Sequence, residues 1–161
     1  ERFAPPYYLS GREFLNLVLT LHRRRYDEAE AEAALADLDL DRDALDKPVR
    51  NLSKGMTQKL GLAGCFLADK DLLVLDEPMS GLDPRARVLV KRVLERLRGR
   101  GKTLFFTTHA LADVEEVCDE MVILHAGEVR FAGDARTLRE RHGGCDLESA
   151  FLRAIGDPAA A

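Results

Sequence analysis

One segment constrains this chain more than any other, a run of four apolar residues, Leu72–Leu75, followed directly by Asp76, Glu77 and Pro78. A continuous apolar run of this length is typical of a strand buried in a parallel sheet. The two carboxylates would then lie at the carboxyl end of the strand, where α/β sheets bind their ligands. Asp76 is placed to hold Mg²⁺ through water, and Glu77, pointing the other way, to orient or deprotonate an attacking water. The alternative is that two acids and a proline merely end a strand.

Helical patterns precede this strand and alternate with strands after it. Apolar spacing and capping side chains predict three early helices, near residues 10–21, 27–38 and 53–68. After residue 70 the order is strand, helix, strand, helix, strand, with apolar runs at 72–75, 103–107 and 121–124. This alternation predicts an α/β fold with a parallel sheet. A hairpin turn at 126–128 and two short helices complete the expected order.

The composition is that of a mildly acidic globular chain. Its 161 residues are 46% hydrophobic and 32% charged, with a formal charge of −4. These values exclude a disordered chain, and the acidic balance argues against a nucleic-acid partner, whose binders are usually strongly basic. The length suits a single domain, and no apolar run approaches the roughly 18 residues of a membrane span.

The cysteines are three, at wide spacing, and include no Cys-x-x-Cys pair. Neither a disulfide framework nor a zinc site is therefore expected. Cys65 and Cys118 have apolar neighbours in the sequence and are interpreted as small core residues. This cysteine usage suits a reducing, cytoplasmic setting.

Three further segments accompany the strand and its acids. Asn51–Met56 stands at the start of an expected helix, Ser80–Asp83 follows the acids at once, and Thr107–His109 ends the next strand. In this order and spacing, the four segments resemble the signature, the Walker B strand, the D-loop and the switch histidine of the ATPase subunit of ABC transporters. The resemblance implies an α/β fold of the P-loop NTPase (ABC ATPase) type. That fold would be incomplete here, with a helical subdomain followed by part of the parallel-sheet core.

The start of the helix after Leu52 is suited to phosphate. Helix N-termini present free N–H groups and a positive dipole end, while Ser53 adds a hydroxyl and Gly55 lets the backbone come close. The resemblance implies that this segment faces the γ-phosphate of ATP held by a second subunit. The family's usual Leu-Ser-Gly-Gly-Gln is here Leu-Ser-Lys-Gly-Met, so that Lys54 adds a cation, and this variant resembles exporter-type subunits. Ser53 can also be a plain helix cap.

The resemblance assigns roles to three other residues. His109 would donate a hydrogen bond to the γ-phosphate and hold the attacking water, although a lone histidine is more often structural. Asp83 would cap the helix that it precedes and carry state between the two composite sites of a dimer. Glu1 falls where the family's Q-loop residue stands and would contact Mg²⁺. With Asp76 and Glu77, these residues complete the expected site for ATP and Mg²⁺.

The sequence contains no Gly-x-x-x-x-Gly-Lys-Ser/Thr segment, the P-loop that cradles phosphates. We therefore expect the chain to be a piece of a longer ATPase without its N-terminal portion. Alone, this piece is expected to bind ATP weakly and to hydrolyse it negligibly. A truncated sheet would also expose a strand edge, which invites pairing with other chains.

The resemblance also divides the chain and implies partners. Residues 1–50 would hold the end of the Q-loop and the helical subdomain, 51–133 the signature helix and the α/β core, and 134–161 the C-terminal helices and tail. The expected partners are a second ATPase subunit, in a head-to-tail dimer, and a transmembrane permease, with contacts near Tyr7 and Tyr8. The protein would lie peripherally at the cytoplasmic face of the membrane and power export.

Two other functions stay open at this point. The C-terminal head of an SMC-type DNA-repair ATPase carries the same motifs without a P-loop, but a long heptad coiled coil precedes it. Residues 1–50 contain no sustained heptads. The other alternative is a non-catalytic interaction module that uses the motif remnants as a docking surface. A P-loop upstream in the parent gene would exclude the interaction-module hypothesis. Co-purification with a membrane protein would distinguish the transporter hypothesis from the DNA-repair hypothesis.

Overall fold

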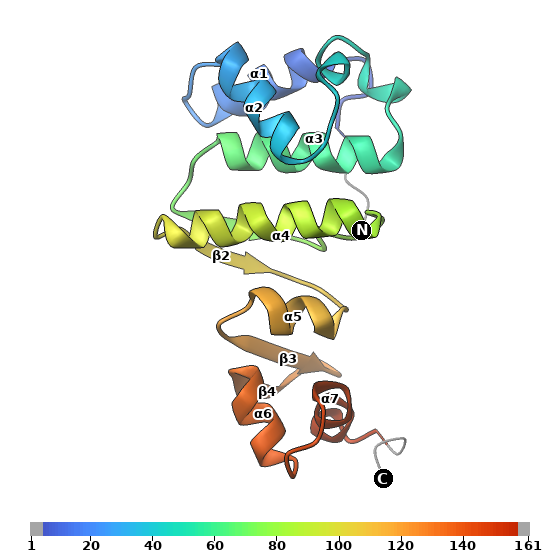
Figure 1. Ribbon diagram of the computed structural model, residues 1–161, viewed down its shortest axis with the longest axis vertical. Coiled ribbons are helices and arrows are strands. Elements are labelled where there is room, and N and C mark those ends of the chain that lie inside the picture. Colours follow the sequence, from blue (N-terminus) through green and yellow to red (C-terminus); the bar gives the residue numbers. More distant parts are fainter. Residues whose placement is uncertain (1–4, 158–161) are drawn as a thin grey trace. The chain divides into compact units, whose positions relative to one another are not determined.

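A computed structural model describes residues 5–157 of the chain, so Glu1 lies outside the described residues (Figure 1). Contacts within the chain divide it into two compact units, one ending at Thr107 and the other beginning at Thr108. The three-part division expected from the resemblance stays a prediction. Within the described part of the chain, no helix combines the length and the apolar character needed to cross a membrane.

The first unit opens with a helical part. Its elements are α1 (Gly11–Leu21), α2 (Glu28–Asp37), the 3₁₀ turns η1 (Arg42–Leu45) and η2 (Val49–Asn51), and α3 (Lys54–Leu67). Ser10 and Glu13 form the predicted capping box, each side chain accepting a hydrogen bond from the other's backbone N–H. Asp27 caps α2 and Ser53 caps α3, as the sequence predicts. The helices bury a shared set of leucines, among them Leu15, Leu19, Leu35, Leu38, Leu45 and Leu60.

A β–α–β arrangement completes the first unit. β1 (Leu72–Leu75) and β2 (Thr103–Phe106) pair in parallel, with Leu75 opposite Phe106. The crossover helix α4 (Pro84–Gly99) begins with Asp83 as its cap and Pro84 at the first helical position, where a missing N–H costs nothing. The sequence predicts both strands and this helix.

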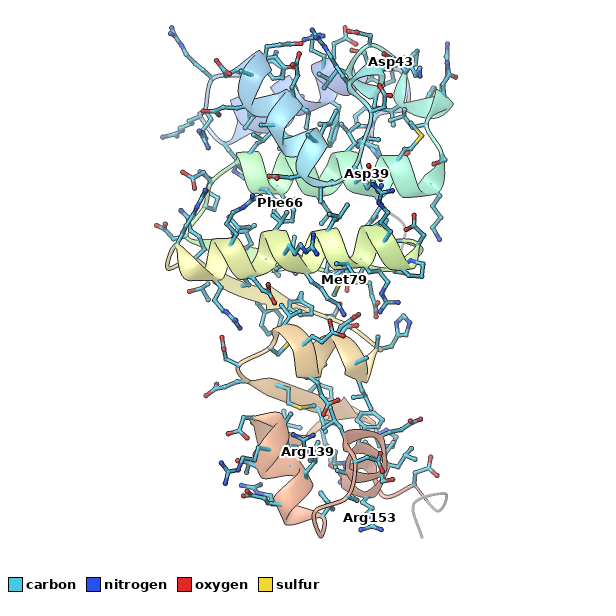
Figure 2. All side chains as sticks on the ribbon, viewed as in Figure 1. Asp39, Asp43, Phe66, Met79, Arg139 and Arg153 are labelled. Carbon is cyan, nitrogen blue, oxygen red and sulfur yellow. The ribbon has the colours of Figure 1, made fainter. Side chains whose placement is uncertain are left out.

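Charged side chains connect α4 with the helical part. Arg96 pairs with Asp37 at the end of α2. The Asp39 carboxylate, labelled in Figure 2, lies 3.2 Å from the Arg85 guanidinium of α4. The backbone carbonyl oxygen of Asp39 accepts a hydrogen bond from Lys59 of α3. Because such surface pairs contribute about 1 kcal/mol or less, they orient the elements more than they stabilise them.

The parallel pair is apolar on both faces, but only one face is covered by the described residues. Leu73 and Leu75 are buried, whereas Leu72, Val74 and Phe105 are 55%, 67% and 57% exposed. The prediction of a strand buried on both faces is therefore wrong for β1 in this structure. The physical reason is that this sheet has two strands and packs its helices against one side.

The second unit is a hairpin backed by helices. Its elements are α5 (Leu111–Val117), β3 (Met121–His125), β4 (Glu128–Gly133), α6 (Ala135–Arg141) and α7 (Leu147–Ile155). Ala126 and Gly127 have φ values of 51° and 78°, as a tight type I′ turn requires. Ile123 and Phe131 point from the strands into a core that includes Leu138 of α6. The hairpin and both final helices match the sequence prediction.

The third predicted strand does not continue the parallel sheet within the described residues. β3 pairs antiparallel with β4. The two-residue turn brings the two strands together as immediate neighbours, and such a short connection permits only antiparallel pairing. The strand and its hairpin with β4 were predicted correctly, but the place of β3 in the parallel sheet was not.

Candidate functional site

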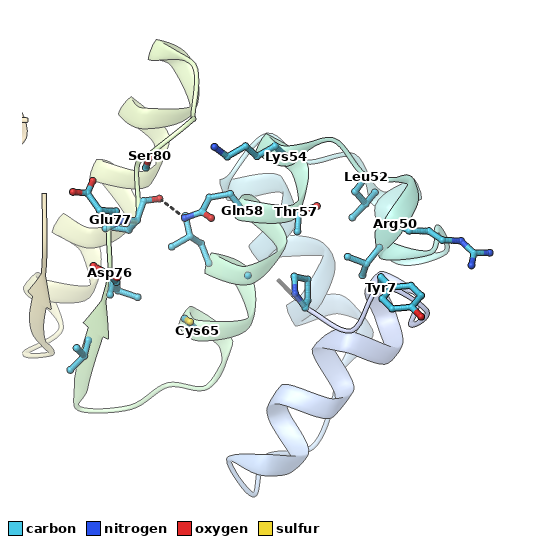
Figure 3. Close-up of a pocket in the computed structure, with 17 residues that line it drawn as sticks. Tyr7, Arg50, Leu52, Lys54, Thr57, Gln58, Cys65, Asp76, Glu77 and Ser80 are labelled. Carbon is cyan, nitrogen blue, oxygen red and sulfur yellow. Dashed lines mark hydrogen bonds between the residues drawn. The ribbon is translucent and has the colours of Figure 1, made fainter. Parts of the chain in front are cut away.

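A cavity of about 700 Å³ lies in the first unit, between α3 and the loop after β1 (Figure 3). Lys54 and Gln58 line it from α3, and Asp76, Glu77 and Ser80 line it from the loop. The cavity therefore brings together one cation and two carboxylates that the sequence analysis assigned to a single site.

The backbone after β1 turns sharply at the second acid. The strand ends at Leu75, and Glu77 has a φ of 46°, in the left-handed region that residues other than glycine rarely adopt. Such a backbone costs about 1–2 kcal/mol. The Ser80 N–H donates to the Glu77 carbonyl oxygen at 3.0 Å and closes the turn. The alternation argument for Glu77 therefore does not hold, because the turn and not the strand sets the direction of its side chain.

The hydroxyl of Thr107 joins the two acids. Its Oγ1 donates a hydrogen bond to Asp76 Oδ1 and accepts one from the Glu77 N–H at 3.0 Å. Thr107 follows β2, which runs beside β1, and its own N–H donates to the Leu75 carbonyl at 3.1 Å. The carboxyl ends of the two parallel strands are thus connected through one side chain.

The start of α3 is open to an approaching anion. Ser53 Oγ accepts a hydrogen bond from the Met56 N–H at 3.2 Å, so the serine is the helix cap. A Cβ built on Gly55 would meet no atom within 4 Å. There is therefore open space beside Gly55 at this end of a 14-residue helix, where the helix dipole favours negative charge.

Helix α3 also contacts the loop after β1 at two points. Gln58 Nε2 donates to the Pro78 carbonyl oxygen at 3.1 Å (Figure 3). The Lys54 side chain lies against Gly81, where an added Cβ would be 3.3 Å from Lys54 Cε. Gly81 has a φ of 71°, which favours glycine. The lysine that departs from the usual signature thus packs on the segment that resembles the D-loop.

Asp83 caps α4 in the structure. Its Oδ1 accepts a hydrogen bond from the Ala86 N–H at 2.9 Å. This bond to the ionised form holds the pKa of Asp83 below its usual value. The capping role is confirmed, and the role in signalling between subunits stays a prediction.

His109 belongs to the second unit, which begins one residue earlier. It is exposed, between Thr108 and α5, and the Thr108 hydroxyl accepts a hydrogen bond from the Ala110 N–H at 3.1 Å. The structure thus gathers Asp76, Glu77 and Lys54 within the first unit, with Ser53 and Gly55 at the same helix start as Lys54. His109 is part of the other unit, and Glu1 lies outside the described residues.

Cys65 is exposed and lines the cavity, and Cys118 is half-buried. The interpretation of both as core residues is therefore wrong. The buried stretch of α3 ends at Gly64, and Cys65 lies on the side of the helix that faces the cavity.

Some of these residues suit nucleotide phosphate, and others suit a hydrated cation. The open N-terminus of α3 and the Lys54 ammonium suit phosphate. Asp76 is exposed, and Thr107 engages only its Oδ1, so that Oδ2 is left to contact Mg²⁺ through water. Among residues 5–157, no three His, Cys, Asp or Glu side chains gather as a cluster that could hold a metal ion by themselves.

Sequence reasoning missed two residues of this site. Thr107 was noted only as a neighbour of His109, although a hydroxyl at the end of a strand parallel to β1 could have been matched to Asp76. Gln58 stands four residues after Lys54, one turn further along α3 on the same side. That spacing indicates that Gln58 lies on the same side of the helix as Lys54. The hydrogen-bond partner of Gln58, the Pro78 carbonyl, lies in a turn whose path the sequence does not predict.

Comparison with known protein families defines the class. Residues 9–112 match the family described as "AAA domain, putative AbiEii toxin, Type IV TA system". This match covers more than half of the chain, so the chain belongs to this AAA domain family.

Individual relatives define the family more narrowly. An uncharacterized ABC transporter ATP-binding protein of Nostoc sp. is 39% identical over 133 residues, 78% of this chain and 38% of that protein. Nod factor export ATP-binding protein I of Rhizobium leguminosarum bv. viciae is 44% identical over 110 residues, 68% of this chain and 34% of that protein. A solved ATP binding subunit of an ABC transporter, 30% identical, superposes with a TM-score of 0.80 over 96% of this chain and 65% of its own. The chain belongs to the ABC transporter ATP-binding proteins and has their P-loop NTPase fold, and it spans under two-thirds of the length of these relatives.

Proposed function

We propose that the protein containing this chain is the ATP-binding and ATP-hydrolysing subunit of an ABC transporter that powers export through a membrane permease. The observation that carries the proposal is the joining of Asp76 and Glu77 by Thr107 beside the open N-terminus of α3. The export direction is supported by the Leu-Ser-Lys-Gly-Met variant and by the name of one relative, a Nod factor export protein.

Each site residue has a role that its surroundings support. Asp76 would hold Mg²⁺ through water, and Glu77, with its backbone fixed by the turn, would orient or deprotonate the attacking water. Ser53, Lys54 and Gly55 would bind the γ-phosphate at the start of α3. When bound, ATP supplies the phosphoryl group, and Mg²⁺ neutralises the charge that develops on it.

His109, Glu1 and Asp83 complete the proposed site on the strength of the resemblance. His109 would donate to the γ-phosphate, Glu1 would contact Mg²⁺, and Asp83 would connect the two composite sites. Because the signature would face ATP held by another subunit, the proposal includes a head-to-tail dimer as well as the permease. The complex would lie at the cytoplasmic face of the membrane.

The chain alone is proposed to turn over ATP negligibly. Its sequence has the acids and the signature, but no P-loop to cradle the phosphates. Purified residues 1–161 should therefore show no ATPase activity above a Glu77→Gln control. Turnover at a rate normal for this class, abolished by Glu77→Gln, would contradict this part of the proposal.

The main test uses the complete protein, assembled with its permease. Glu77→Gln keeps the size of the side chain but removes its basicity, so ATP turnover should fall by about 100-fold or more. Glu95→Gln, on the exposed surface of α4, is the matched control and should leave turnover within about twofold. Unchanged turnover in the Glu77→Gln protein would reject the proposed function.

A further inference from the structure

We propose that Thr107 is a positioning residue for both catalytic acids, through a hydroxyl that fixes the Asp76 carboxylate and the Glu77 backbone together. The inference rests on the proposed function and adds a residue to it. The structure assigns this role through two hydrogen bonds to adjacent residues of one loop, made by a single side chain that directly follows the neighbouring strand, β2.

The pairing of the strands brings Thr107 to this place. β1 and β2 are in register, with Leu75 opposite Phe106, so the next residues along, Asp76 and Thr107, stand side by side. The bond from the Thr107 N–H to the Leu75 carbonyl extends the ladder one step beyond the strands. The hydroxyl therefore starts from backbone that the sheet already holds.

The chemistry of the three groups fixes the direction of both hydrogen bonds. An ionised carboxylate only accepts, and a backbone N–H only donates, whereas a hydroxyl donates once and can accept as well. The Thr107 hydroxyl must therefore donate to Asp76 and accept from Glu77. A serine can reproduce both bonds, and a valine of nearly the same shape can make neither.

Each bond constrains a different feature of the site. The bond to Asp76 Oδ1 holds the plane of the carboxylate and engages the oxygen on the β2 side. The bond from the Glu77 N–H supports a backbone with a φ of 46°, which its surroundings must hold in place. Loss of the hydroxyl should loosen the metal-binding group and the base at the same time.

The first experiment measures amide hydrogen exchange of the chain by NMR. In Thr107→Val, the Glu77 amide should exchange about tenfold faster than in the original chain, because its acceptor is gone. In Thr107→Ser the rate should be nearly unchanged. Thr103→Val, the same substitution at an exposed position at the start of β2, should also leave it unchanged. Equal exchange of the Glu77 amide in the Val and Ser variants would overturn the inference.

The second experiment measures ATP hydrolysis by the complete assembled protein. Thr107→Val should lower kcat about tenfold, while the KM for ATP stays within about twofold, because the hydroxyl acts on the acids and not on nucleotide affinity. It should also raise the Mg²⁺ concentration needed for half-maximal rate. Thr107→Ser should restore both values, which a merely structural loss would not explain.

The two levels of proposal fail in different ways. If Glu77→Gln abolishes turnover and Thr107→Val does not lower it, the positioning role is wrong and the proposed function stands. If Glu77→Gln leaves turnover intact, the proposed function itself is wrong. A Thr107→Ser protein as slow as Thr107→Val would also reject the positioning role, because the hydroxyl would then not be the active group.

Discussion

The helical part of the first unit, residues 10–67, and its β–α–β part, residues 72–106, complete their packing to different degrees. In the helical part, leucines such as Leu15 and Leu60 are fully buried, although Leu17 and Leu21 of α1 are exposed, and a side chain caps each helix. In the β–α–β part, the sheet buries Leu73 and Leu75 but leaves Leu72 and Val74 exposed. The helical part thus packs its helices around a shared core, whereas one face of β1 is left uncovered by the described residues.

The proposed site lies where these two parts meet. The acids lie at the end of the strand whose outer face is uncovered, and they are held by a few hydrogen bonds. The start of α3, which we propose binds phosphate, belongs to the helical part. The proposed site therefore lies between the well-packed helical part and the loop after β1, and the contacts of Gln58 and Lys54 connect the two.

The largest expected effect tests this contrast directly. Leu60→Ala removes a fully buried side chain and should lower the free energy of unfolding by about 2–5 kcal/mol. Val74→Ala, at a position 67% exposed, should change it by only about 0.5 kcal/mol. Urea unfolding of the chain measures both.

If Val74→Ala destabilised the chain as much as Leu60→Ala, the outer face of β1 would be covered in solution, for instance by pairing between copies. A dependence of the Val74→Ala effect on protein concentration would identify such pairing, because association makes stability depend on concentration.

The sequence predicted most elements of both parts, because their signals are local. Capping residues, apolar spacing and the Asp83-Pro84 pair each act within one or two turns of chain. Burial of β1 on both faces and the place of β3 in the parallel sheet were not predicted correctly. Both depend on what packs against a strand from elsewhere in the chain, and a run of apolar residues does not report this.

The residues of the candidate site also fall into two groups, those that local sequence patterns predict and those that depend on distant contacts. The positions of Asp76 and Ser53 follow from the end of a strand and the start of a helix, which local patterns predict. The direction of Glu77 depends on a left-handed backbone, and the roles of Thr107 and Gln58 depend on contacts across 20 residues or more. Sequence spacing alone could not supply those contacts.

A substitution of intermediate expected effect tests the contact between Lys54 and Gly81, which connects the two parts. Gly81→Ala places a side chain at a φ of 71° and pushes it against Lys54, so the chain should lose about 1–2 kcal/mol of unfolding free energy. Gly99→Ala, at the end of α4 with nothing within 4 Å of the new Cβ, is the control and should be neutral or slightly stabilising.

The two causes can be separated by a double variant. In a Lys54→Ala background the crowding is relieved, so Gly81→Ala should cost less than in the original chain. Equal costs in the two backgrounds would mean that only the backbone is strained and that Lys54 does not contact Gly81. Thermal unfolding of the four proteins gives this difference as a double-variant cycle.

The smallest expected effect compares how the two parts respond to acid. α3 is capped by the Ser53 hydroxyl, which does not titrate, whereas α4 is capped by Asp83, whose pKa is lowered by its bond from the Ala86 N–H. A lowered pKa in the folded state means that the stabilisation is complete above the unfolded value of about 3.9 and is lost as the pH falls through the folded value.

Below about pH 4, the Ala86 amide should therefore lose protection from hydrogen exchange before the Met56 amide does, after correction for intrinsic rates. Asp83→Ser should abolish this difference, because both helices would then have hydroxyl caps. Equal acid responses of Ala86 and Met56 in the original chain would show that the Asp83 carboxylate contributes nothing to holding the start of α4.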